Sequence, residues 1–238
     1  SAVAGTDPQV VDCANGFDPR DLLPAVEGAT RDGAPGYLAV VPTQLSACLD
    51  AGDEIVSALR SLSAILVGGA ATNHLLLERA KDMGLPVVTS YGMTETCGGC
   101  VYDGVPLGGV SLRIESPDAS GAGRIVISGP VLAEARLDGG ASASSARAAS
   151  PTSSFFARDG ALRELITGDR GRLLPDGRLE VLGRLDDVIV TGGVKVEPAD
   201  VEAVLSGLEG VARACVVGVP DDVWGSAVVA VVVPRAGA

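Results

Sequence analysis

The sequence predicts an α/β fold in three parts: a parallel-sheet subdomain, a small β-barrel subdomain and a partial α+β C-terminal domain. Residues 1–110 alternate short β-branched runs with helical patterns, which is typical of a parallel sheet covered by helices. Residues 111–184 are short strands between Gly, Pro and Asp-Gly turns, which favours a small barrel. Residues 185–238 follow a β-α-β-β order, which is typical of most of a small α+β domain with its last part missing.

The elements of the first part follow from apolar runs, caps and glycine stops. Apolar runs predict strands at residues 7–13, 36–42, 63–70 and 86–92, and helical patterns predict helices at residues 18–29, 43–52, 54–62 and 72–84. Asp18 and Pro19 start the first helix, Thr72 caps the last one, and Gly84 ends it. Ligand sites in parallel sheets lie at the carboxyl ends of the strands, so the turns there are the first candidates for a site.

The other two parts have weaker but regular patterns. They predict strands at residues 109–116, 123–129, 166–184, 186–196, 211–220 and 226–234, and a helix at residues 197–208 that starts at Pro198. Residues 138–154 are of low complexity and predict a mobile loop.

Composition limits the classes of function. The 238 residues carry a formal net charge of -12, which makes nucleic acid and anionic membranes poor partners and requires any phosphate to be held locally. Five scattered cysteines favour a reducing compartment, so we expect a cytoplasmic protein. The most apolar run, residues 226–234, is too short to span a bilayer, so we expect no membrane insertion.

Two glycine-containing turns are candidate sites. After the strand that includes Leu66, Gly69 would let the backbone approach a flat ligand, although an ordinary strand-to-helix turn explains the same residues. In "SYGMTE", Tyr91 offers an aromatic face, Gly92 removes side-chain bulk, and Thr94 and Glu95 supply a hydroxyl and a hard oxygen ligand. The alternative for this stretch is a capping box at the start of a short helix.

A third candidate site spans residues 167–198. Asp169 follows a β-run, where a carboxylate could accept hydrogen bonds from two vicinal sugar hydroxyls. Arg184 is a cation fifteen residues further on, and two carboxylates follow at Asp186 and Asp187. Two hairpins with solvated turns would explain each residue singly. Together, the three sites favour a nucleotide ligand.

Cys97 and Cys100 have the spacing of a redox dithiol or of half a zinc site. Zinc takes four ligands, and the chain has neither a second cysteine pair nor a histidine cluster. We therefore interpret both residues as small apolar side chains that support a pocket wall.

The motifs "YGMTE", "TGD" and "GRLDDVIVTGGVKVEPADVE" resemble successive core motifs of the adenylate-forming superfamily, which includes acyl-CoA synthetases, luciferases and peptide-synthetase adenylation domains. The resemblance covers essentially the whole chain. Within the superfamily, "VTSYGMTETCGGCVYDGVPLGGV" is most similar to the o-succinylbenzoate–CoA ligases of bacterial menaquinone biosynthesis. The resemblance implies that residues 1–110 are the C-terminal part of the large α/β domain, residues 111–184 its β subdomain, and residues 185–238 the first part of the small C-terminal domain.

The resemblance implies a binding role for several residues that would contact the nucleoside. Gly69 and Ala70 would lie against adenine, and Tyr91 would stack on its ring. Asp169 would hold the ribose hydroxyls, with Arg184 assisting.

The resemblance also implies a two-step reaction. A carboxylic acid attacks the α-phosphate of ATP, and the thiol of coenzyme A then displaces AMP to give a thioester. Thr94 would contact the α-phosphate, Glu95 would bind Mg²⁺, and Lys195 could meet phosphate. We therefore expect Thr94, Glu95 and Arg184 to be the catalytic residues. The implied partners are a small carboxylic acid, ATP and CoA, and a homodimer is compatible with the sequence.

Asp186 resembles the hinge residue between the two domains, and Gly192 and Gly193 match the turn that lines the pantetheine tunnel after the small domain rotates. Three expected parts are absent: the phosphate-binding loop, the motif that gates the acyl pocket, and the lysine near the end of the small domain. We therefore expect a piece of a longer chain that binds nucleotide weakly and does not complete the reaction. The alternatives are another adenylate-forming enzyme, for aryl acids, fatty acids or carrier-protein loading, and a non-catalytic remnant of the fold.

Overall fold

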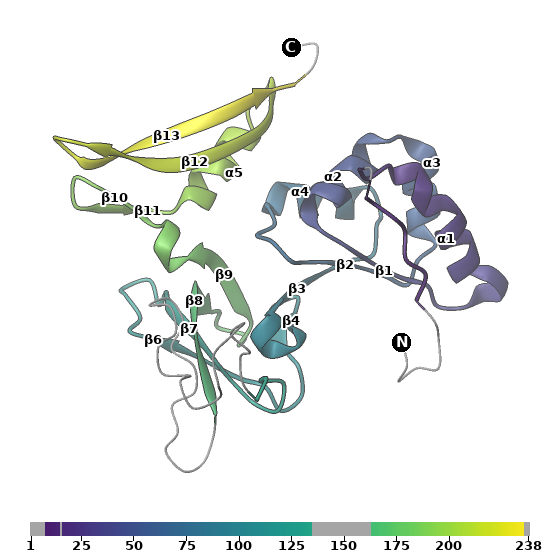
Figure 1. Ribbon diagram of the computed structural model, residues 1–238, viewed down its shortest axis with the longest axis horizontal. Helices are drawn as coiled ribbons and strands as arrows, with labels where there is room; N and C mark the ends of the chain where they lie inside the picture. Colours follow the sequence, from purple (N-terminus) through teal and green to yellow (C-terminus); the bar gives the residue numbers. More distant parts are fainter. Residues whose placement is uncertain (1–7, 15, 135–162, 236–238) are drawn as a thin grey trace. The chain divides into compact units, whose positions relative to one another are not determined.

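The structure is a computed structural model that describes residues 8–14, 16–134 and 163–235 (Figure 1). The chain forms two compact units, Ser1–Thr89 and Ser90–Ala238. Within the described ranges, every helix is too short or too polar to cross a membrane. The loop predicted at residues 138–154 lies outside the described residues, and the two predicted boundaries between the three parts stay predictions.

The first unit contains a parallel sheet with helices packed on it. Its strands are β1 (Tyr37–Val40), β2 (Ala64–Val67) and the first half of β3 (Val87–Met93), with β2 between the other two. Leu38 pairs with Ile65, and Ile65 pairs with Val87, all in parallel register. The helices are η2 (Pro19–Asp21), α1 (Leu22–Ala29), η3 (Arg31–Gly33), α2 (Pro42–Asp50), α3 (Asp53–Arg60) and α4 (His74–Asp82).

The ends of these helices show how the local sequence sets the chain path. The Asp18 carboxylate accepts the Arg20 N–H at 2.9 Å, as expected for the cap at this point. Helix α4 is capped by Asn73, whose side chain accepts the Leu75 N–H, rather than by Thr72 as predicted. The core beneath the helices consists of aliphatic residues, including Leu45, Ile55, Val56, Leu59 and Ile65.

The second unit begins where β3 continues as an antiparallel partner of β4 (Gly98–Tyr102), which in turn pairs with β5 (Val105–Pro106). A separate sheet has the order β6-β7-β8-β9, with β6 (Ser111–Glu115), β7 (Gly123–Ser128), β8 (Glu164–Leu173) and β9 (Leu179–Arg184). All its pairings are antiparallel. Cys100, Ile125, Ile127 and Leu165 belong to one core cluster of this unit.

The end of the described chain has the predicted β-α-β-β order. It comprises η5 (Leu185–Asp187), β10 (Ile189–Thr191), β11 (Val194–Val196), α5 (Pro198–Ser206), β12 (Val211–Asp221) and β13 (Gly225–Pro234). Strands β12 and β13 form the long antiparallel hairpin coloured yellow-green in Figure 1. The Glu202 carboxylate of α5 accepts the Val216 N–H of β12 at 2.8 Å, which ties the helix to the hairpin.

The predicted fold class is confirmed, with two corrections in detail. The prediction of a strand at residues 7–13 is wrong, because residues 8–13 form no strand and Val10 is 88% exposed. The valines of this segment pair with no neighbouring strand among the described residues. The β subdomain is an open four-stranded sheet over the described residues and not a closed barrel.

Candidate functional site

The turn after β3 is held by the hydroxyl of Thr96. This side chain is 2% exposed, accepts the Met93 N–H at 2.9 Å and lies 2.7 Å from the Gly98 carbonyl oxygen, to which it donates. The short helix η4 (Thr94–Thr96) therefore has a capping hydrogen bond, as the alternative interpretation of "SYGMTE" required. The N-cap is Met93, the side chain that bonds to its N–H is that of Thr96 at the third helical position, and Thr94 is exposed at the start of the turn.

Gly92 is required by a close approach of two backbone segments. A Cβ at this position would lie 2.1 Å from the carbonyl oxygen of Gly98 on the paired strand. That oxygen belongs to the backbone and cannot move aside as a flexible side chain would. Gly92 thus allows β3 and the following turn to pack together, which places Thr94 and Glu95 directly after the strand.

Asp169 is the centre of a polar group that contains three of the predicted site residues. Its Oδ2 accepts the hydroxyl of Tyr91 at 2.7 Å, and its Oδ1 lies 3.1 Å from Nη1 of Arg184. The carboxylate is almost buried, with 8% of the residue exposed. Two side chains from distant parts of the sequence, those of Tyr91 and Arg184, therefore meet at the Asp169 carboxylate.

The backbone around Asp169 is fixed by its neighbours. The buried hydroxyl of Thr167 accepts the Asp169 N–H at 3.1 Å and donates to the Ile125 carbonyl at 2.8 Å. Residue 168 has no room for a side chain, since a Cβ on Gly168 would lie 2.8 Å from the guanidinium of Arg184. Thr167 is the first residue of the "TGD" motif, but its role was not predicted from the sequence.

The phenol of Tyr91 stays protonated. Burial, followed by the nearby negative charge of Asp169, raises its pKa well above the ordinary value. The ring is half-buried and packs against the core cluster that contains Cys100 and Ile125. Tyr91 is therefore a hydrogen-bond donor to Asp169 at physiological pH.

The guanidinium of Arg184 contacts the Asp169 carboxylate on one side and solvent on the other. Its side chain is 50% exposed, and a second carboxylate, that of Asp186 in η5, lies 3.8 Å from Nη2. Arg184 ends β9 opposite Asp169 of β8, so the sheet register brings the two together. The exposed part of the guanidinium is available to an anionic ligand.

The predicted glycine turn forms the tip of the β10–β11 hairpin. Gly192 and Gly193 have φ of 55° and 82°, in the left-handed region that favours glycine. The Gly192 N–H donates to the Trp224 carbonyl at 2.9 Å, and a Cβ on Gly192 would lie 2.6 Å from the Trp224 ring. Lys195 is exposed on β11. These three predicted site residues form a group of their own.

Gly69 and Ala70 lie in the first unit, exposed and just after β2. Gly69 has φ of 79°, in the left-handed region that favours glycine, and a Cβ added there would lie 3.5 Å from a methyl of Val41. The glycine turn is thus a real conformational feature at the carboxyl end of a parallel strand. Its place relative to Tyr91 stays a prediction.

The two cysteines of the predicted motif have different surroundings. Cys97 is exposed with φ of 54°, whereas Cys100 is fully buried in the second core cluster. Burial raises the pKa of the Cys100 thiol. Among the described residues, no group of three or more His, Cys, Asp and Glu side chains could hold a metal. Glu95 fits a different kind of site, because Mg²⁺ is commonly bound by one or two carboxylates together with substrate phosphates and water.

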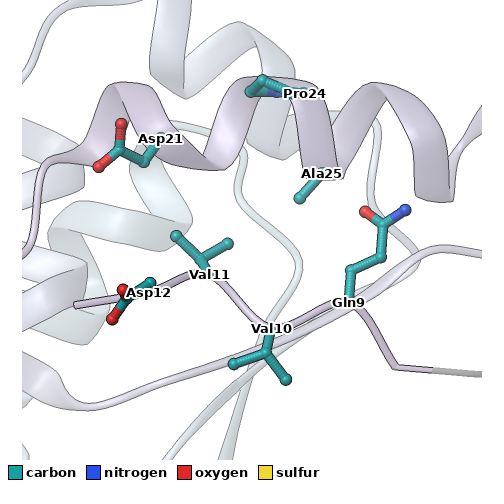
Figure 2. Close-up of a pocket in the computed structure, with 7 residues that line it drawn as sticks. All are labelled: Gln9, Val10, Val11, Asp12, Asp21, Pro24 and Ala25. Atoms are coloured by element: carbon teal, nitrogen blue, oxygen red, sulfur yellow. The ribbon is translucent and has the colours of Figure 1, made fainter. Parts of the chain in front are cut away.

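A surface hollow in the first unit is lined by none of the predicted site residues. Figure 2 shows it between the segment Gln9–Asp12 and the helical residues Asp21, Pro24 and Ala25. It offers two carboxylates and apolar side chains but no cation, so its chemistry does not suit a phosphate.

Two family models match the chain. Residues 10–135 match the AMP-binding enzyme model, and residues 200–238 match the model of the AMP-binding enzyme C-terminal domain. The sequence is 38% identical over 235 residues to a protein of Mycobacterium tuberculosis H37Rv named probable 2-succinylbenzoate–CoA ligase, covering 98% of this chain and 56% of that protein. It is 36% identical over 195 residues to the 2-succinylbenzoate–CoA ligase of Bacillus cereus ATCC 10987, covering 73% of this chain and 37% of the relative. The chain thus spans about half the length, or less, of the curated relatives it matches.

Solved structures show the same similarity. The o-succinylbenzoate CoA synthetase MenE from Bacillus subtilis, in complex with the acyl-adenylate intermediate OSB-AMP, superposes with a TM-score of 0.69 at 29% identity, covering 94% of this chain and 45% of that one. ATP-bound MatB from Rhodopseudomonas palustris gives a TM-score of 0.74 at 28% identity, covering 94% and 44%.

Proposed function

Since the chain belongs to the family of AMP-binding enzymes, we propose that it carries the nucleotide-binding residues of an ATP-dependent carboxylate–CoA ligase that acts on 2-succinylbenzoate in menaquinone biosynthesis. The observation that carries the proposal is the 38% identity to a protein of that name along 98% of this chain. The polar group at Asp169 supports the nucleoside part of the proposal, because it combines a fixed carboxylate with an aromatic ring and a cation.

Each residue of the group has a role that its geometry allows. Asp169 would accept hydrogen bonds from the two ribose hydroxyls, since a carboxylate has about four acceptor positions and the protein uses two of them. The ring of Tyr91 would stack on adenine, and Gly69 and Ala70 would lie against the base. The exposed edge of Arg184 would help to hold the nucleotide.

The turn at η4 would serve the phosphates. Thr94, exposed directly after β3, would donate its hydroxyl to the α-phosphate. Glu95 would hold Mg²⁺ together with phosphate oxygens, and the metal would supply neutralisation of phosphate charge. Lys195 is an exposed cation on β11 and would meet phosphate once the small domain has rotated.

The chemistry consists of two displacements at one site. A carboxylate oxygen of the acid attacks the α-phosphorus, and the bond to pyrophosphate breaks to give an acyl-adenylate. The thiol sulfur of CoA then attacks the acyl carbon, loses its proton and releases AMP. Holding the reactants in line supplies much of the rate. Rotation of the small domain at Asp186 would convert the site from the first step to the second and bring the turn of Gly192 and Gly193 to the pantetheine chain of CoA.

The test is thioester formation by the full translation product of the gene. It is given ATP, Mg²⁺ and CoA with 2-succinylbenzoate, benzoate, a fatty acid or an amino acid, and each CoA thioester is identified by mass spectrometry. We expect 2-succinyl-benzoyl-CoA and AMP in equal amounts. Thioester formation from another acid, with none from 2-succinylbenzoate, would disprove the assigned substrate.

A second candidate is another adenylate-forming enzyme. It is favoured by the TM-score of ATP-bound MatB, which is higher than that of MenE, and by the similarity to the amide bond synthetase McbA from Marinactinospora thermotolerans, at 26% identity with a TM-score of 0.69. The same acid panel, repeated with an amine in place of CoA, separates the two candidates by the acid and the acceptor that react.

A further inference from the structure

Asp169 uses both of its carboxylate oxygens for protein contacts before any ligand arrives. Oδ2 accepts the hydroxyl of Tyr91 at 2.7 Å, and Oδ1 lies 3.1 Å from Nη1 of Arg184. One contact on each oxygen fixes the rotation of the carboxylate about its Cβ–Cγ bond. It also leaves one acceptor position on each oxygen, which matches a pair of vicinal hydroxyls.

We propose that the Tyr91 hydroxyl is a positioning group that, together with Arg184, orients the Asp169 carboxylate toward the 2′ and 3′ hydroxyls of the nucleotide ribose. This inference rests on the proposed function and assigns Tyr91 a second role beside the stacking of its ring. The hydroxyl acts through Asp169 and does not itself contact the ribose.

The surroundings of Asp169 support an oriented carboxylate. Thr167 fixes the backbone N–H of Asp169 from a buried position, and the missing side chain of Gly168 lets Arg184 lie close to the strand. The raised pKa of Tyr91 keeps the phenol protonated and therefore a donor. Ordered groups of this kind reduce the free energy that binding would otherwise spend on orienting the carboxylate.

A purely structural role for the same hydrogen bond makes a different prediction. The bond joins β3 to β8 across 78 residues of sequence, so it also contributes to the stability of the second unit. If it served stability alone, its loss would weaken every nucleotide to the same extent. If it positions Asp169, its loss would weaken only nucleotides that have ribose hydroxyls.

The experiment compares the affinity of the protein for ATP and for 2′,3′-dideoxy-ATP by isothermal titration calorimetry with Mg²⁺ present. In wild type, we expect ATP to bind more tightly than the dideoxy nucleotide. In Tyr91→Phe, which keeps the ring, we expect ATP affinity to fall about threefold to tenfold, the range for one typical intramolecular hydrogen bond. Affinity for dideoxy-ATP should change less than about twofold, because that nucleotide has no hydroxyls for Asp169 to accept.

The matched control is Tyr102→Phe. Tyr102 is a half-buried tyrosine on the neighbouring strand, and within the described part of the chain its hydroxyl makes a single long contact of 3.4 Å, to the Gly99 carbonyl. Its removal should leave both affinities unchanged. Equal weakening of ATP and dideoxy-ATP in Y91F would overturn the positioning role, as would an unchanged ATP affinity. Wild type that binds neither nucleotide would instead overturn the proposed function, and the inference with it.

A second measurement needs no folded variant at position 91. The chain has three tyrosines, so ¹³Cζ labelling gives three resonances, which Tyr37→Phe and Y102F assign. Stacking of adenine shifts the Tyr91 resonance with either nucleotide, and the difference between ATP and dideoxy-ATP isolates the effect at the hydroxyl. We expect a larger shift with ATP; identical shifts would overturn the inference.

Discussion

The turn that carries Thr94 and Glu95 depends on a single buried hydroxyl, so Thr96→Val should destabilise the second unit. Valine has the same shape but cannot accept the Met93 N–H, which Thr96 accepts at 2.9 Å. Leaving one buried donor without a partner costs about 1–3 kcal/mol. The Gly98 carbonyl, on an exposed residue, can turn to water and adds less. For a unit of this size, a loss of about 2 kcal/mol lowers Tm by roughly 4–8 °C.

The assay is thermal unfolding followed by circular dichroism, with Thr94→Val as the matched control two residues earlier in the same turn. Thr94 is exposed, so T94V should leave Tm within about 1 °C of wild type while it weakens ATP binding, because it removes the hydroxyl assigned to the α-phosphate. T96V should show the large shift in Tm. Equal Tm for T96V and wild type would refute the role of the Thr96 hydroxyl in holding the turn.

Three further changes test other parts of the structure. Arg170→Ala leaves the nearly buried carboxylate of Glu197 without its cation, and it should lower the free energy of unfolding measured in urea by about 3 kcal/mol. Arg172→Ala breaks an ion pair whose side chains are each 39% exposed, and it should lower the same free energy by less than about 1 kcal/mol. Equal losses in the two variants would contradict the argument from burial. Burial raises the pKa of the Cys48 thiol from 9.0 to about 11, so stability should be intact below pH 9 and fall as pH rises toward 11. Cys48→Ala should make that fall smaller, and the remainder should come from Cys100 and Tyr91, whose pKa values burial also raises. Gly92→Ala should distort the turn and reduce both Tm and ATP affinity, since its Cβ would lie 2.1 Å from a backbone oxygen; an ATP affinity equal to that of wild type would show that the turn does not serve the nucleotide.

Periodicity and turn residues predicted the elements well where the segments had partners. The strand at residues 86–92 is β3, because its apolar run can pair with β2 on one side. The run at residues 7–13 looks similar in composition but forms no strand, and Val10 is exposed. A local pattern shows which residues favour extended backbone, whereas the presence of a neighbouring strand is a tertiary property.

The candidate site was predictable as a set of residue types but not as a set of contacts. The sequence indicated that Tyr91, Asp169 and Arg184 would serve one ligand. It could not show that the Tyr91 hydroxyl reaches Asp169, since 78 residues separate them and the contact depends on how β3 and β8 pack. The same holds for Thr96, whose hydroxyl accepts the Met93 N–H and donates to the Gly98 carbonyl.

The most direct test of the account is the binding of a stable analogue of the o-succinylbenzoyl adenylate, measured by calorimetry beside AMP and an acetyl adenylate analogue. We expect the o-succinylbenzoyl analogue to bind more tightly than the other two ligands, and Asp169→Ala to weaken the binding of all three. Equal affinity for the three ligands would contradict the assignment of the acid. Binding that is unchanged in D169A would contradict the nucleotide site itself.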